Sequence, residues 1–97
     1  MQNKNIQALL AEAQKKQRAF DKAVKEIEET EYEISKNGIV KIVMLGNKTI
    51  ISIDIDKDAL NSDDKEMIEE TLLKAMNAII ADIENDIESA REVHLGQ

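Results

Sequence analysis

The 97-residue chain has no cysteine, tryptophan or proline, and only one histidine, one tyrosine and one phenylalanine. Without cysteine it cannot form a disulfide framework, a zinc ribbon or a thiol nucleophile, so we expect a protein of the reducing cytoplasm. The longest apolar runs, such as residues 42–45, fall far short of the roughly 18 residues that a membrane span needs, and no signal-type apolar region follows the first residues. We therefore expect one domain, residues 1–97, with no membrane partner.

The charges of the chain are numerous and unevenly placed. Twenty acidic and 13 basic side chains give a formal net charge of −7, which by itself argues against a partner as negative as nucleic acid. Residues 1–25, however, hold six basic and two acidic side chains, a balance of +4, whereas residues 26–97 hold 7 basic and 18 acidic ones, a balance of −11. The sequence thus describes a basic N-terminal arm on an acidic body.

The N-terminal arm has the pattern of a long helix. Steps of four and three separate the repeat positions, which predicts a helix from about residue 3 to 29. The repeat positions are Ile6, Leu10, Ala13, Gln17, Phe20, Val24 and Ile27. Gln17 is the one polar member and a candidate for setting register or orientation. The opposite side of this helix carries four basic residues, here called the basic stripe: Lys15, Arg18, Lys22 and Lys25.

The middle of the chain has the pattern of strands. Residues 30–35 alternate in the strand manner, residues 39–45 are rich in β-branched side chains, and Asn37-Gly38 between them is typical of a type I′ hairpin turn. A second turn at Gly46-Asn47 leads to a strand at residues 49–55, whose Ile51, Ile53 and Ile55 are expected to share one buried face. The sequence predicts a three-stranded antiparallel meander.

A second long helix is predicted to follow and to reach about residue 92. Residues 61–63 supply N-cap candidates, and Asp63 and Glu66 have capping-box spacing. Its broad apolar face comprises Ile68, Leu72, Leu73, Met76, Ile79, Ile80, Ile83 and Ile87. The fold class is therefore α+β, in the order α-β-β-β-α. Helices of roughly 40 and 45 Å cannot both be covered by three strands, and the sheet has two open edges, so we expect a homodimer.

Three features that suggest chemistry have simpler structural interpretations. The alternating carboxylates of residues 54–58 resemble a calcium loop, but Ala59 and Lys65 stand where glycine and the bidentate glutamate are needed, so we predict no metal site. His94 has no nucleophile at a suggestive spacing and is expected in a frayed terminus. The carboxylates of the last helix are expected on its polar face. No catalytic residue and no cofactor is predicted, and the protein is not expected to be an enzyme.

Several segments resemble the YbaB/EbfC family of bacterial nucleoid-associated proteins, over about residues 6–92. They are residues 10–17 (LAEAQKKQ), 38–42 (GIVKI), 53–56 (IDID) with Leu60, 64–70 (DKEMIEE) and 75–77 (AMN). The most specific is the Asp-Lys-Glu-Met run followed by Ala-x-Asn. The resemblance implies a cytoplasmic, nucleoid-associated homodimer whose helices project from a central sheet like tweezers and bind DNA, often with little sequence preference, without catalysis or cofactor.

The resemblance also assigns DNA contact to the projecting helices. Here the projecting helices map to the basic stripe, with Lys4 and Lys16 assisting at its edges, and to the distal part of the last helix. Double-stranded DNA is the predicted partner. Residues 62–97 carry three basic and 10 acidic side chains, and the family's glycine-rich N-terminus and Gly/Met-rich tail are missing, so the last helix is a poorer DNA surface. The alternative hypothesis is an acidic helical protein-interaction module without physiological DNA binding, in which the stripe is an ordinary solvated helix face. No particular protein partner is indicated.

Overall fold

The computed structural model describes residues 2–96, apart from the side chains of residues 2–4 and of Ser62. The elements are α1 (Gln2–Glu29), β1 (Glu31–Lys36), β2 (Val40–Leu45), β3 (Ile50–Ile55) and α2 (Lys65–Leu95), with the 3₁₀ turns η1 (Lys57–Ala59) and η2 (Ser62–Asp64) before α2. The predicted α+β class and α-β-β-β-α order are confirmed.

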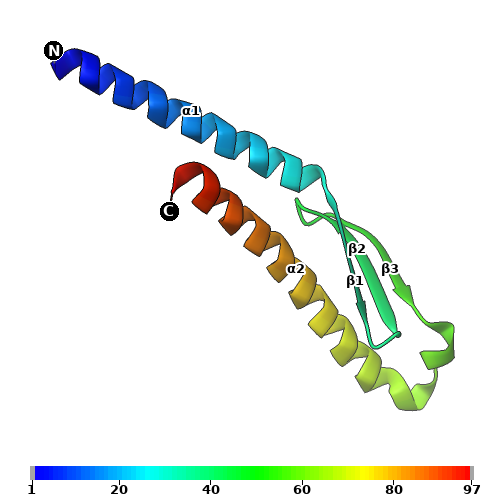
Figure 1. Ribbon diagram of the computed structural model, residues 1–97. Helices are drawn as coiled ribbons and strands as arrows, with labels where there is room; N and C mark the ends of the chain where they lie inside the picture. Colours follow the sequence, from blue (N-terminus) through cyan, green and yellow to red (C-terminus); the bar gives the residue numbers. More distant parts are fainter. Residues whose placement is uncertain (1, 97) are drawn as a thin grey trace.

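The chain is strongly elongated. Its principal extents are 75 × 19 × 14 Å and its Cα radius of gyration is 20.2 Å, against about 13 Å for a compact domain of 100 residues. The last turns of α2 lie beside the middle of α1, and the first turns of α1 project past them (Figure 1). Within the described residues, neither helix combines the length and apolar character that a bilayer span requires.

The sheet is an antiparallel meander with β2 in the centre. Asn37 and Gly38 have φ values of 56° and 66°, as both central residues of a type I′ turn require, so the predicted hairpin turn is confirmed. In the second turn the left-handed residue is Lys48, with a φ of 73°. Gly46 in that turn is buried against the end of α1, and its N–H donates to the Thr30 carbonyl at 2.9 Å.

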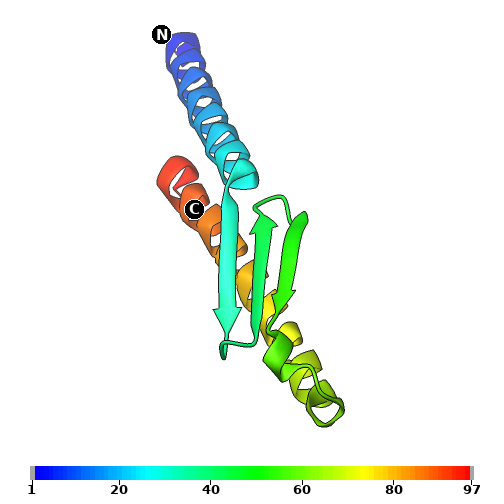
Figure 2. The ribbon, with the colours of Figure 1, turned by 90° about the vertical axis from the view of Figure 1, so that its right-hand side faces the viewer.

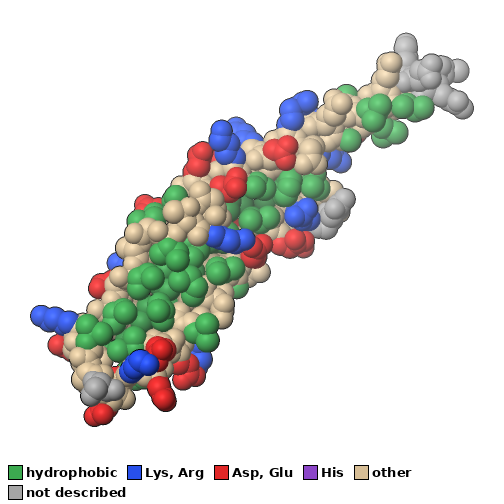
Figure 3. All heavy atoms as spheres, turned by 180° about the vertical axis from the view of Figure 1, so that it is seen from behind, with side chains coloured by type: hydrophobic (Ala, Val, Ile, Leu, Met, Phe, Trp, Pro, Cys, Tyr) green, Lys and Arg blue, Asp and Glu red, His purple; other side chains and the backbone are tan. Residues whose placement is uncertain are grey.

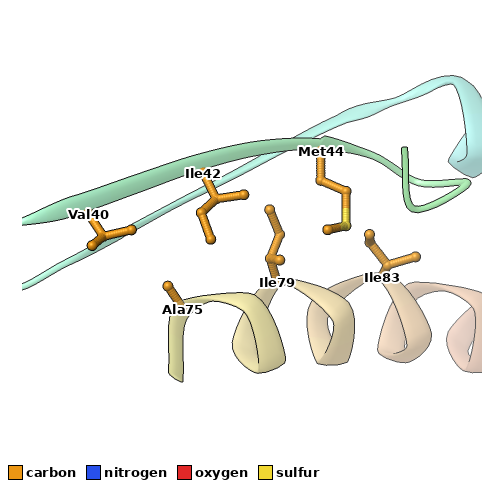
Figure 4. Close-up of a cluster of buried hydrophobic side chains, with 6 residues drawn as sticks. All are labelled: Val40, Ile42, Met44, Ala75, Ile79 and Ile83. Carbon is orange, nitrogen blue, oxygen red and sulfur yellow. The ribbon is translucent and has the colours of Figure 1, made fainter. Parts of the chain in front are cut away.

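The core lies between β2 and α2. Alternate β2 side chains face α2, whose buried residues recur every four positions because a helix on a sheet buries one narrow stripe. The cluster comprises Val40, Ile42, Met44, Ala75, Ile79 and Ile83 (Figure 4). The predicted apolar face of α2 was too broad: Leu73 is 62% exposed, whereas Thr71 and Ala75, which the prediction omitted, are buried.

The prediction that Ile51, Ile53 and Ile55 share one buried face is wrong for Ile51 and Ile53 in the single chain, whereas Ile55 is half-buried against the core. α2 runs obliquely behind the sheet and packs on β1 and β2 (Figure 2), so Ile50 and Ile53 remain 46% and 45% exposed. The regular alternation of side chains along β3 is also interrupted, because a register shift at Val43/Met44 leaves Ile51 without a pairing partner in β2. Ile53 pairs with the buried Ile42 and therefore points to the same side of the sheet as α2, but beyond its cover.

Both ends of α2 differ from expectation. Asp64 is the N-cap and makes no side-chain cap, while Asn61 Oδ1 accepts from the Asp63 N–H at 3.2 Å and caps η2 instead. The predicted Asp63–Glu66 capping box is therefore wrong. At the other end the helix continues through His94, and the Gly96 N–H donates to the Glu92 carbonyl at 3.1 Å. His94 thus lies in a capped final turn, which corrects its placement in a frayed terminus.

Tyr32 joins the sheet to α2. Its hydroxyl donates to Asp86 Oδ2 at 2.6 Å. Burial, this hydrogen bond and the negative charges of Asp86 and Asp82 raise the pKa of Tyr32 to about 12. The shift links sheet–helix packing to a titration that can be followed spectroscopically.

We expect the phenol absorbance of the folded protein to titrate near pH 12, and that of the unfolded chain near pH 10. Tyr32 is the only tyrosine and tryptophan is absent, so the signal belongs to one group. Because the folded-state pKa is raised, Tyr32 contributes stability that is present below pH 10 and lost as the pH rises toward 12. Asp86→Asn should lower the midpoint partway, since burial remains, and Asp54→Asn should not; equal midpoints in the two variants would contradict the assignment.

Candidate nucleic-acid interface

The basic stripe lies on the outward side of α1. All four of its side chains are exposed, whereas Phe20 is buried at 9% exposure on the side that packs against α2. At 100° per residue the stripe lies roughly 140–160° around the helix from Phe20. Among the described residues, no carboxylate lies within 4.0 Å of a stripe cation. The four positive charges therefore face solvent without a carboxylate partner in the described part of the chain.

The basic residues of α2 are arranged differently. Each pairs with a glutamate of its own helix, at distances of 3.5, 3.2 and 3.3 Å in the pairs Lys65–Glu69, Lys74–Glu70 and Arg91–Glu88. Residues 65–95 carry three basic and eight acidic side chains, so α2 is negative overall. The unpaired positive charge of the two helices is thus concentrated on α1.

The two residues predicted at the edges of the stripe have different surroundings. Lys16 Nζ lies 3.6 Å from Glu12 Oε1. Both side chains, together with the stripe residue Lys15, line a shallow groove beside the end of α2, where His94 also lies. Lys4 belongs to α1, but its side chain is outside the part that the structure describes. Gln17, predicted to set register, donates from Nε2 to Asp21 Oδ1 at 2.9 Å within the same helix and contacts no other element through this bond.

Besides its general packing against α2, two specific contacts help to hold α1 in place. At its base the Asn47 N–H donates to the Glu28 carbonyl at 3.2 Å, beside the buried Gly46. Farther out, the Arg91 guanidinium carbon lies 5.1 Å from the centroid of the Phe20 ring. Sequence reasoning missed both contacts. The one available signal was that Arg91 is the only Lys or Arg after Lys74.

A strip of apolar side chains is uncovered between β3 and α2. The Tyr32–Asp86 bond turns one flank of α2 toward β1, so the opposite flank lies toward β3. The strip, called the apolar strip below, comprises the exposed Ile50 and Ile53 and the half-buried Leu72, Met76 and Ile80. Figure 3 shows how extensively hydrophobic side chains are exposed along the body of the molecule. Patches of this kind mark interaction surfaces.

The chain is a small, elongated α+β protein in which the basic stripe, unpaired among the described residues, offers a surface suited to a negatively charged partner. The sequence profile of the YbaB/EbfC DNA-binding family matches residues 1–96. The chain belongs to this family.

Individual relatives are similar to this chain over most of its length. A nucleoid-associated protein of Malacoplasma penetrans is 34% identical over 84 residues, covering 87% of this chain and 89% of the relative. A nucleoid-associated protein of Clostridium novyi is 37% identical over 90 residues, covering 92% and 77% of the two chains. An uncharacterized protein of Mycoplasma pneumoniae is 35% identical over 88 residues, covering 90% and 83%.

Proposed function

We propose that this protein binds double-stranded DNA with low sequence specificity, as a homodimer associated with the bacterial nucleoid in the cytoplasm. It acts by binding and needs neither catalysis nor a cofactor. The observation that carries the proposal is the basic stripe: four exposed cations on one face of a projecting helix, unpaired within the described chain. Lys16 and Lys4 assist at its edges.

The chemistry of the stripe suits phosphates rather than bases. Lys15 and Lys25 are ten residues apart, which is about 15 Å along the helix, so the side chains can follow several phosphates of one backbone strand. Such contacts position a protein on the duplex without reading its sequence. The only aromatic residue of α1, Phe20, is buried against α2, so the stripe offers no platform for stacking unpaired bases.

The interface of the proposed homodimer consists of the apolar strip and the edge of β3. The outer edge of β3 is open in the single chain, and its isoleucines stand exposed on the side of the sheet that α2 covers only in part. A second copy related by a two-fold axis covers the same surface on both chains. The dimer then carries two basic stripes, and eight phosphate contacts at most correspond to a log-log salt slope of about −7.

The test is an anisotropy titration with a random-sequence duplex at two salt concentrations. Replacing all four stripe residues by glutamine should weaken binding by about 100-fold or more and flatten the salt dependence, because the released counterions come from these contacts. A second duplex of unrelated sequence should bind with similar affinity.

The matched control removes four positive charges from the body: Lys41, Lys57, Lys65 and Lys74, each replaced by glutamine. All four are exposed, and the net charge changes equally. If the control weakens binding as much as the stripe variant, the stripe is not the site. If the wild-type protein fails to bind at low salt, DNA binding is refuted and the acidic protein-interaction module takes its place.

A further inference from the structure

We infer that Arg91 is a positioning residue for DNA binding: its stacking on Phe20 fixes the direction in which α1 projects, and with it the placement of the basic stripe. The inference rests on the proposed DNA-binding role of α1. Arg91 belongs to the distal part of the acidic helix α2 and is not a member of the basic stripe. The inference depends on the contact between Arg91 and Phe20 and on the length of α1 beyond its junction with the sheet.

Arg91 and Phe20 meet where the two helices run side by side. The guanidinium carbon is 5.1 Å from the ring centroid, which is within the roughly 6 Å range of a cation–π contact. Phe20 is the only α1 residue classed as buried among those whose burial the structure describes. Arg91 Nε also lies 3.3 Å from Glu88 Oε2, one turn earlier on α2. The guanidinium thus contacts both the Phe20 ring and the Glu88 carboxylate, which restricts its orientation.

The contact lies far enough along α1 to control the direction in which the outer part of the helix points. α1 joins the sheet at Thr30, and its main packing partner is α2. Phe20 lies ten residues from this junction and Lys15 fifteen, which correspond to about 15 and 22 Å. A tilt of about 20° at the junction would displace Lys15 by about 8 Å, more than twice the 3.4 Å rise per base pair of a duplex. Loss of the contact would therefore misplace the outer stripe residues.

Arg91 contacts the side of α1 that carries Phe20, which is opposite the basic stripe. The stripe lies roughly 140–160° around α1 from Phe20, so a duplex seated on the stripe does not reach the ring. The contribution of Arg91 is accordingly to pre-organise the arm, which reduces the conformational freedom that binding must remove.

Arm geometry can be measured without DNA. The chain has no cysteine, so Ala8→Cys and Asn85→Cys place one spin label on each helix, at exposed positions away from the stripe and from Arg91. Labelled chains are mixed with an excess of unlabelled chains, so that distances arise within one chain. We expect a narrow distance distribution in the parent, a broad one in Arg91→Gln and in Phe20→Leu, and a narrow one in Arg91→Lys, which keeps the cation.

DNA affinity of the same three substitutions, without labels, tests the functional consequence. Arg91→Gln and Phe20→Leu should each weaken binding by about 5- to 10-fold, and the double variant should be no weaker than either single one, because both remove one contact. Arg91→Lys should restore binding. Phe20→Leu is decisive because it changes no charge: if Arg91→Gln weakens binding and Phe20→Leu does not, Arg91 contacts DNA directly and the inference is wrong.

Two other results would also overturn it. Unchanged distance distributions in Arg91→Gln would show that the contact does not direct the arm, and additive losses of affinity would show that the two side chains act separately. Failure of the wild-type protein to bind DNA is a different result. It refutes the proposed function, while the distance measurement still decides whether Arg91 positions α1.

Discussion

Replacing Gly46 by alanine is expected to lower the free energy of unfolding by about 3 kcal/mol, at the upper end of the range for overpacked sites. A Cβ at this position would lie 1.9 Å from the Ile27 carbonyl oxygen, 2.6 Å from the Ile27 carbonyl carbon and 3.1 Å from the Glu28 Cα. All three atoms are backbone atoms at the end of α1, so no side-chain rotation relieves the clash. The second turn and α1 must move apart, which also strains the Asn47–Glu28 hydrogen bond.

Thermal unfolding followed by circular dichroism measures the effect. For a chain of this length, a loss of 3 kcal/mol corresponds to a melting temperature lower by roughly 12 to 24 °C. Gly38→Asn is the matched control: Gly38 has a φ of 66° with open space around its Cβ position, and asparagine tolerates this conformation. An unchanged melting temperature for Gly46→Ala would show that the approach of the turn to α1 is not as close as described.

Replacing Ile53 by aspartate is expected to dissociate the proposed homodimer and leave each chain folded. The side chain is 45% exposed in the single chain, so an aspartate there keeps much of its hydration. In the dimer it would be buried without a partner on both copies, which costs several kcal/mol. The dimer dissociation constant should rise by at least about 100-fold, equivalent to about 2.7 kcal/mol. Sedimentation equilibrium gives the constant, and circular dichroism reports the fold.

Ser52→Asp is the control for strand propensity and added charge. Ser52 is the neighbouring residue, is exposed, and pairs with Val43 on the opposite side of the sheet from the apolar strip. It should remain a dimer. If Ile53→Asp dimerises as tightly as the wild type, the second copy does not cover this part of β3. If it unfolds instead, Ile53 belongs to the core of the single chain and its exposure has been misjudged.

The secondary structure was predictable because its signals are local. The steps of three and four along α1, the Asn37-Gly38 turn and the β-branched strands each depend on a few neighbouring residues. Burial depends on how distant elements meet. Nothing near Ile53 in the sequence indicates that α2 crosses the sheet obliquely, or that the ladder shifts register at Val43/Met44. The capping box failed for a related reason: η2 intervenes, and Asn61 caps that turn before α2 begins.

The candidate interface was likewise predictable only in part. Helical periodicity alone places Lys15, Arg18, Lys22 and Lys25 opposite Phe20, and the structure leaves them exposed on that side. Whether a cation is paired depends on side-chain contacts, which residue spacing does not settle. Arg91 lies 71 positions after Phe20, and no periodic pattern links two residues so far apart. A contact between elements of this kind becomes visible only when the helices are placed in space.

The elongation of the chain has a consequence for its hydrodynamics. A compact protein with a radius of gyration of 20.2 Å would contain about 340 residues. Because an elongated shape also raises the frictional coefficient, a single chain of 97 residues diffuses more slowly and elutes earlier than a globular protein of the same mass. An early elution volume would therefore imitate an oligomer even for a monomer. Stoichiometry must accordingly come from absolute mass, by light scattering or sedimentation equilibrium, and not from column calibration.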